Sequence, residues 1–377
     1  MIYLDNSATT RVSQEAAKKA LYVMTECFGN PSSLHSLGFK AELEIKNARK
    51  IISSLISCRE GEIFFTSGGT EANNTAILGA ARANAKRGNK IVVSAVEHSS
   101  CIDAAKHLSM QGFEVVFVSP DENGCVSPQK IADAVDEKTV LVALMLVNNE
   151  TGAVFDVATA FAGARRKNNK ILTLCDCVQA FCKIPVHVGR LGADMISITA
   201  HKIGGPKGCG ALYVKKGSKI QPLIFGGQQQ NAFRPGTENA ASIAAFAVAA
   251  DEANKKMPAA YSSVKELKNR LIEGLEKIDG VKINSPENAI PYVVNFSTNK
   301  IKSETMMHFL EQKEIYVSGG SACSKGSRSH VLSALSFDDK RIDTAIRVSF
   351  NGENTVDDID AFLEAVKEGI ETLQKIK

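Results

Sequence analysis

Short apolar runs alternate with amphipathic segments over the first two thirds of the chain. Seven of these runs have the length of a buried strand, at 63–65, 91–94, 114–118, 140–146, 171–174, 195–198 and 210–214. Segments with helical periodicity separate several of them, at 71–87, 100–110, 128–135 and 157–167. Continuous apolar strands between amphipathic helices are typical of a mostly parallel sheet that helices cover on both faces. The pattern therefore predicts a large α/β domain over residues 13–256, with a seven-stranded sheet.

The pattern changes after a long helical stretch at 240–257 and then 263–278. Short strands are predicted beyond it at 281–284, 292–297, 316–318 and 345–349, with helices at 303–312 and 355–376. This mixture predicts a smaller α+β domain over residues 257–377, which residues 1–12 are expected to join.

Composition narrows the class of protein. The 377 residues suffice for two hydrophobic cores, and the net charge of +4 is too small to indicate a nucleic acid or a membrane surface as partner. No apolar stretch reaches transmembrane length and the N-terminus does not resemble a signal peptide, so we expect a cytoplasmic protein. The nine cysteines contain no C-x-x-C pair and indicate neither a disulfide framework nor a metal site.

One lysine stands out by its position between two predicted strands. Lys202 follows His201 and precedes a Gly/Pro-rich turn. Most lysines are solvated, but a lysine crowded in this way suits a reactive amine. Such an amine can form a Schiff base with an aldehyde, and the aldehyde cofactor of proteins is pyridoxal 5'-phosphate (PLP).

Other residues that PLP requires follow other predicted strands. Gly69 and Thr70 lie between a strand and a helix, where backbone N–H groups can bind phosphate, although a simple helix cap is the alternative. Asp176 can hold the pyridine nitrogen protonated, or it can cap a helix. His98 can stack on the ring and act as an acid or base. Asn149 can supply an amide to the ring hydroxyl.

Thr199 and His201, beside Lys202, complete a possible phosphate shell. In sheets of this type ligands bind beyond the carboxyl ends of the strands, where all these residues are expected. Each has a structural explanation by itself. Their combination at the strand ends of one sheet predicts a PLP site.

Two further residues indicate the substrate. Cys323 lies among small residues at 317–327, so a thiol that packs a core is the less favoured explanation. A thiol in such a loop can attack the sulfur of a bound substrate, and Lys325 would favour the reactive thiolate. Arg347 can clamp the α-carboxylate of an amino acid through two parallel hydrogen bonds, with Asn30 assisting. A surface ion pair is the alternative for Arg347.

These motifs resemble those of cysteine desulfurases in the class V aminotransferase group, which are fold type I PLP enzymes. The resemblance runs nearly end to end and includes the segments 3–10, 29–33, 234–239 and 321–323. It implies that Lys202 binds the cofactor aldehyde, Asp176 the pyridine nitrogen, Asn149 and Gln179 the ring oxygen, and His98 the ring face. It also implies that the phosphate is held by Gly69, Thr70, Thr199 and His201, with Thr237 reaching over from a second subunit. Shared sites of this kind imply a homodimer.

The resemblance further implies an activity. The enzyme would remove sulfur from L-cysteine and give L-alanine and a persulfide on Cys323, with Lys202 removing the α-proton. The sulfur would pass to an acceptor protein such as an iron–sulfur scaffold. A selenocysteine lyase and an aminotransferase for small amino acids are the alternatives within the same class, and transamination does not need Cys323. A PLP-binding protein without turnover is a third possibility.

The chain departs from the family pattern at 226–231, which reads Gly-Gly-Gln-Gln-Gln-Asn where Gly-Gly-Gly-Gln-Glu-Arg is common. Gln228 replaces a glycine and Asn231 an arginine. Thr199 stands where serine is usual but keeps the hydroxyl. If the missing arginine normally helps to hold the phosphate or the dimer edge, we expect this protein to do so differently.

Overall fold

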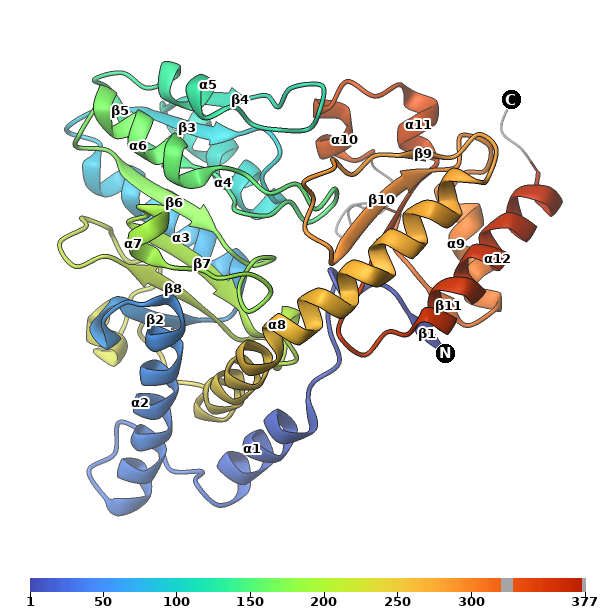
Figure 1. Cartoon of the computed structure of the whole chain (residues 1–377). Coiled ribbons are helices and arrows are strands. Elements are labelled where there is room, and N and C mark those ends of the chain that lie inside the picture. Colours follow the sequence, from blue (N-terminus) through green and yellow to red (C-terminus); the bar gives the residue numbers. More distant parts are fainter. Residues whose placement is uncertain (320–327, 375–377) are drawn as a thin grey trace.

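The computed structural model describes residues 1–319 and 328–374. A seven-stranded sheet forms the larger part of the molecule (Figure 1). In spatial order its strands are β2 (Ile63–Thr66), β8 (Gly210–Val214), β7 (Met195–Thr199), β6 (Leu172–Asp176), β5 (Thr139–Ala143), β3 (Lys90–Ser94) and β4 (Glu114–Val118). Strand β8 runs antiparallel to the other six strands of this sheet, and these six run parallel to one another. The mostly parallel seven-stranded sheet that the sequence predicts is therefore confirmed.

Helices cover both faces of this sheet, because successive residues of a buried strand point to opposite faces. In β3, Ile91 and Val93 pack in one apolar cluster with helices α3 and α4, whereas Val92 packs in another with α5 and α6. The bounds of the helices and 3-10 turns in this part are α1 (Gln14–Thr25), α2 (Ser36–Ile56), η1 (Glu60–Glu62), α3 (Gly69–Asn84), α4 (Ser99–Met110), α5 (Pro128–Asp133), α6 (Val157–Lys167), α7 (Val188–Leu191), η2 (Ala200–Lys202) and η3 (Gln229–Ala232).

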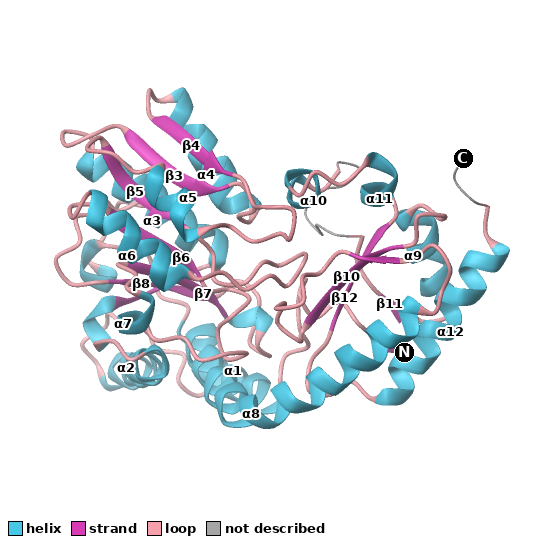
Figure 2. Cartoon of the chain, turned by 45° about the horizontal axis from the view of Figure 1, so that its top comes forward, coloured by secondary structure: helices cyan, strands magenta, loops and turns pink. Residues whose placement is uncertain are grey.

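The C-terminal part contains a small antiparallel sheet in the order β12-β10-β9, of which Figure 2 labels β10 and β12. The first residues of the chain lie here, since β1 pairs in parallel with β11. The elements of this part are β1 (Ile2–Tyr3), β9 (Lys282–Ile283), β10 (Val293–Ser297), α9 (Ser303–Gln312), β11 (Ile315–Tyr316), α10 (His330–Ala334), α11 (Asp339–Asp343), β12 (Ala345–Ser349) and α12 (Val356–Thr372). The domain boundaries at 12/13 and 256/257 stay predictions.

Helix α8 (Ala240–Glu276) connects the two parts and corrects one expectation. The sequence predicted two helical segments, at 240–257 and 263–278, but one helix of 37 residues runs through Pro258. Proline removes one backbone donor from a helix and clashes with the preceding turn. Here α8 packs against α1 and α2 in the large part and against α12 in the small part, which offsets that cost.

Several element ends also lie a few residues from the expected positions, among them the ends of β5 and α12. The predicted strand 140–146 ends at Ala143, although Leu144 and Leu146 still donate backbone hydrogen bonds to β6 carbonyls at 3.0 and 2.9 Å. The last helix ends at Thr372 rather than at 376. Among the helices in the described ranges, none combines the length and the apolar character needed to cross a membrane.

Candidate active site

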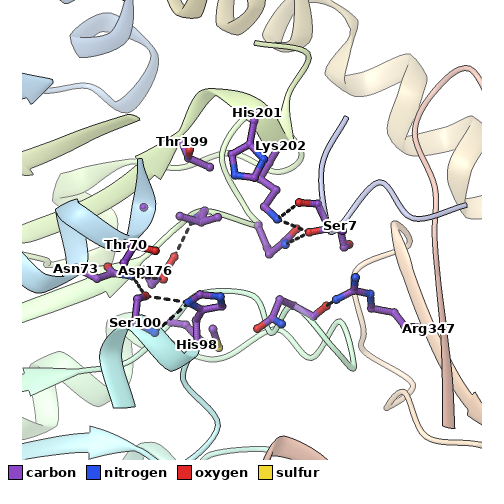
Figure 3. A pocket seen from close by; sticks show the side chains of 16 residues that line it. Ser7, Thr70, Asn73, His98, Ser100, Asp176, Thr199, His201, Lys202 and Arg347 are labelled. Carbon is purple, nitrogen blue, oxygen red and sulfur yellow. Dashed lines mark hydrogen bonds between the residues drawn. The ribbon is translucent and has the colours of Figure 1, made fainter. Parts of the chain in front are cut away.

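A cavity of about 210 Å³ lies at the carboxyl ends of the strands in the large sheet, where the small sheet approaches it. Most of the residues that the sequence singled out line this one cavity (Figure 3). They are Gly69, Thr70, His98, Asn149, Asp176, Gln179, Thr199, His201, Lys202 and Arg347. The structure thus brings together side chains that come from five strand ends of the large sheet and from β12.

The first turn of α3 forms an anion-binding end of the cavity. Its N-cap, Gly68, has φ +153°, a conformation that residues with a side chain rarely adopt. A Cβ atom at Gly69 would lie only 2.8 Å from Val178 Cγ2, so glycine permits close packing here. The backbone N–H groups of a first turn have no acceptor within the helix and attract anions. This end of the cavity suits a phosphate, with the Thr70 hydroxyl beside it.

Asp176 ends strand β6 and is only 5% exposed. Its two carboxylate oxygens accept hydrogen bonds from Asn73 Nδ2 at 2.7 Å and from the Val178 N–H at 2.8 Å. These donors fix the orientation of the carboxylate toward the cavity. The sequence reasoning missed Asn73, although it lies three residues after Thr70 and therefore on the same face of α3.

His98 is the N-cap residue of α4, and its Nδ1 atom is engaged in hydrogen bonding with Ser100. Its Nδ1 accepts from the Ser100 N–H at 3.1 Å and lies 2.9 Å from Ser100 Oγ. Burial lowers the pKa of His98, so the neutral form dominates near pH 7. A neutral ring with Nδ1 as acceptor carries its proton on Nε2, which can exchange that proton with a bound ligand.

The N-terminal segment supplies the partners of Lys202, which the sequence reasoning did not anticipate. Lys202 Nζ donates to the carbonyl oxygens of Ser7 at 2.5 Å and Ala8 at 2.7 Å. His201 Nδ1 lies 3.2 Å from Thr9 Oγ1. Burial, together with nearby Lys202, lowers the pKa of His201 to about 4, so its imidazole is neutral beside the anion-binding end.

Arg347 lies on β12 at the opposite end of the cavity and is only 2% exposed. Its Nη2 is 2.8 Å from Asp5 Oδ1, and its Nη1 donates to the Asn149 carbonyl at 3.0 Å. The alternative of a surface ion pair is therefore wrong. A buried guanidinium at a cavity suits recognition of a carboxylate.

Unpartnered polar atoms show where a ligand fits. Asn149 Oδ1 and Arg347 Nε are buried, and neither has a hydrogen-bond partner within residues 1–319 and 328–374. Buried polar atoms are normally satisfied, so these two atoms indicate space for a polar ligand. Together with a helix N-terminus, the Asp176 carboxylate and the Lys202 amine, they form a set that fits a phosphorylated pyridine aldehyde.

Two predicted site residues do not line this cavity, and a third cannot be compared with it because it lies outside the described residues. Asn30 and Thr237 lie together at a second cavity of about 290 Å³, between the end of α1 and the start of α8. Cys323 belongs to residues 320–327 and lies outside the described residues. The roles assigned to these three residues stay predictions.

The segment that departs from the family pattern packs against the edge of the large sheet. The side-chain amide of Gln230 accepts from the Phe65 N–H at 2.6 Å and donates to the Phe65 carbonyl at 2.8 Å. This pair satisfies backbone groups at the exposed edge of β2. Next to it, Arg234 binds Glu71 of α3 through two hydrogen bonds, at 2.9 and 3.2 Å. Both contacts fasten the segment beside the anion-binding turn.

Comparison with known proteins extends over the whole chain. The sequence profile of the family described as Aminotransferase class-V matches residues 2–362. The chain is 39% identical over its full length to cysteine desulfurase IscS of Methanosarcina thermophila, of which the match covers 93%. It is 37% identical over its full length to cysteine desulfurase IscS 1 of Archaeoglobus fulgidus, of which 98% is covered.

Solved structures agree with this relationship. A NifS-like protein superposes with a TM-score of 0.94 at 34% identity, over 99% of this chain and 100% of that one. A structure of SspA in complex with cysteine superposes with a TM-score of 0.84 at 29% identity, over 94% and 100% of the two chains. The profile match, the identities and the shared fold lead to one conclusion: the chain belongs to the class V aminotransferase family.

Proposed function

We propose that this protein is a PLP-dependent cysteine desulfurase, which converts L-cysteine into L-alanine and transfers the sulfur to Cys323. The observation that carries the proposal is the single cavity that joins Lys202, Asp176 and the buried Arg347. An amine, a carboxylate and a carboxylate clamp in this arrangement suit an amino acid that reacts on PLP. The names of the relatives, cysteine desulfurases of about the same length, support this substrate.

The residues that would hold PLP follow from the geometry. The first turn of α3, Thr70, Thr199 and neutral His201 suit the phosphate, and Asp176 suits the pyridine nitrogen. Lys202 Nζ suits the aldehyde carbon. When bound, PLP supplies an electron sink for the α-carbon of the substrate.

The chain's own groups then bind the substrate and move its protons. Arg347 binds the α-carboxylate and so fixes the α-carbon relative to Lys202. Lys202 Nζ takes the α-proton once its amine is free, and His98 Nε2 is placed to hold or return a proton at the substrate.

Sulfur transfer requires Cys323. Its thiolate attacks the substrate sulfur, so that a new S–S bond forms while the carbon–sulfur bond of cysteine breaks. The electron pair of the broken bond stays with the carbon, which takes up one proton to become the methyl group of alanine. L-cysteine and the Cys323 thiol thus give L-alanine and a Cys323 persulfide, without an external oxidant or reductant.

The test is turnover of purified protein loaded with PLP. We expect L-alanine in step with sulfide or protein-bound persulfide when L-cysteine is added, and loss of both products in Cys323→Ser. Alanine without either sulfur product contradicts the proposal. A Cys323→Ser variant that keeps full turnover favours transamination, and a strong preference for selenocysteine over cysteine favours the lyase.

A homodimer is proposed on two observations. Helix α1 and the segments 28–39 and 224–225 expose large apolar side chains, among them Met24, Phe28, Leu34 and Phe225. Exposed apolar side chains that gather on one surface are typical of an interaction site, and Met24 and Phe28 line the same cavity. Thr237, for which the resemblance implies a place in a second subunit's site, lies away from this chain's own candidate site and near that surface.

Sedimentation velocity tests the dimer directly. We expect twice the monomer mass for the wild type. A co-purified mixture of Lys202→Ala and Thr237→Ala subunits should regain activity that neither variant has alone. A monomeric active enzyme contradicts the proposal.

The acceptor and the location of the protein are also proposals. The resemblance to cysteine desulfurases favours a sulfur-acceptor protein such as an iron–sulfur scaffold, and the expected location is the cytoplasm. Transfer of radiolabelled sulfur from the loaded enzyme to a purified scaffold tests the first, and fractionation of cells tests the second.

A further inference from the structure

Lys183 is a buried amine that contacts Gln179, a residue of the cavity lining, and none of the roles above involves it. The residue is 7% exposed and lies in the turn that follows β6. Its Nζ donates to Gln179 Oε1 at 3.0 Å. Within the described part of the chain, no carboxylate lies within ion-pair distance of it. Burial of a lysine amine without a carboxylate partner reduces the stability of the folded protein, so the presence of Lys183 at this position calls for an explanation.

Lys183 and the Ser7 carbonyl together determine which end of the Gln179 amide faces which partner. A lysine amine in its charged form has only hydrogen-bond donors, so the amide atom that it contacts must be the oxygen. The Gln179 NH₂ group then points to the other side, where it donates to the Ser7 carbonyl at 3.0 Å. The same carbonyl accepts from Lys202. A hydrogen-bonded chain thus runs from Lys183 through Gln179 and Ser7 to Lys202.

We propose that Lys183 is a positioning residue that holds the Gln179 NH₂ group as a donor toward the cofactor ring oxygen and adds positive charge near Lys202. The inference rests on the proposed binding of PLP. Gln179 lines the cavity, and its NH₂ group carries a second N–H beside the one that binds the Ser7 carbonyl. Donation to an anionic ring oxygen and a nearby positive charge both disfavour a proton on the cofactor-linked nitrogen of Lys202.

The charges around Lys183 are consistent with this role. Lys202 from η2 and Arg347 from β12 face it, and the Tyr292 ring centroid lies 5.7 Å from its Nζ. Burial, with these two cations, lowers the pKa of Lys183 to about 7. Asp5 is already bound to Arg347. The anionic groups of a bound cofactor would favour the charged form of Lys183.

The test follows the visible absorbance of the PLP-loaded protein as a function of pH. We expect Lys183→Met to raise the midpoint of this titration by about one pH unit, because a like charge and an oriented donor are both lost. Lys183→Arg keeps the charge and the donor-only character, so its midpoint should stay near that of the wild type.

Lys268 offers a matched control. It is also buried, at 8% exposure, and donates to the Ala289 carbonyl at 2.8 Å, outside the cavity. Lys268→Met should reduce thermal stability but leave the midpoint unchanged. If Lys183→Met also lowers thermal stability but leaves the midpoint unchanged, the inference is overturned. It is overturned as well if Lys183→Arg shifts the midpoint as far as Lys183→Met does.

A second variant tests whether Lys183 acts through Gln179. It can refute the positioning role even if Lys183→Met does not fold. Gln179→Leu should raise the midpoint by itself, and the double variant should shift it by less than the sum of the two single changes. An unchanged midpoint in Gln179→Leu, or full additivity, refutes the positioning role. A wild-type chain that takes up no PLP would overturn both this inference and the proposed function, whereas a coloured wild type with insensitive variants overturns this inference alone.

Discussion

Replacement of Arg347 by lysine tests the proposed substrate clamp while it preserves the positive charge. Lysine keeps a cation near Asp5 but cannot form two parallel hydrogen bonds to a carboxylate. The structure places the guanidinium at 2% exposure, so solvent does not replace the lost bond. One charge-assisted hydrogen bond contributes about 1.5–3 kcal/mol. We therefore expect kcat/KM for L-cysteine to fall by roughly 10- to 150-fold.

The assay measures alanine formation over a range of L-cysteine concentrations. Arg270→Lys is the matched control, because Arg270 binds Asp360 at 2.5 and 2.6 Å on an exposed surface. It should leave kcat/KM unchanged. The preference for cysteine over cysteamine, which lacks the carboxylate, should shrink in Arg347→Lys. If that variant retains the wild-type kcat/KM, the guanidinium does not recognise the substrate and the reasoning is wrong.

Three further changes test other parts of the site. Asp176→Asn should still bind PLP but lower kcat/KM by roughly 10- to 150-fold, since one charge-assisted bond is lost; unchanged turnover would contradict the role of the carboxylate. His201 has a folded pKa of about 4, below the usual 6.5, so the unfolded chain binds more protons between these values and stability falls as the pH drops through that window. Thermal unfolding of His201→Asn at pH 7 and pH 5 should therefore show a smaller acid-induced loss than the wild type, and an equal loss contradicts this. Gly68→Ala should reduce the free energy of unfolding by about 1–3 kcal/mol, because Gly68 has a positive φ. Gly61→Ala is the control and should change this free energy little, because a Cβ atom there has open space. Chemical denaturation measures both.

The large sheet was predictable because its strands are short, apolar and separated by amphipathic helices. Period-two burial, such as that of Ile91, Val92 and Val93, leaves a clear pattern in the sequence. The antiparallel direction of β8 was not predicted, because an apolar strand buried on both faces has the same composition in either direction. The path of α8 through Pro258 depends on packing against distant helices, which local propensity does not report.

The candidate site was predictable where chemistry and strand ends coincide, as for Lys202, Asp176 and His98. Its hydrogen-bond partners were not. Ser7 and Ala8 contribute backbone carbonyls, and any residue type can supply those. Lys183 has no motif that distinguishes it from a solvated lysine, and only its burial reveals it.

The ion pair between Asp5 and Arg347 joins residues 342 positions apart. During synthesis, Asp5 leaves the ribosome long before Arg347 has been added to the chain. Lys202 and the phosphate-binding turn of α3 can meet earlier, since both belong to the part that is made first. The candidate phosphate end of the cavity is thus encoded entirely in the first 202 residues, whereas the candidate carboxylate clamp also needs residue 347, one of the last to be synthesised.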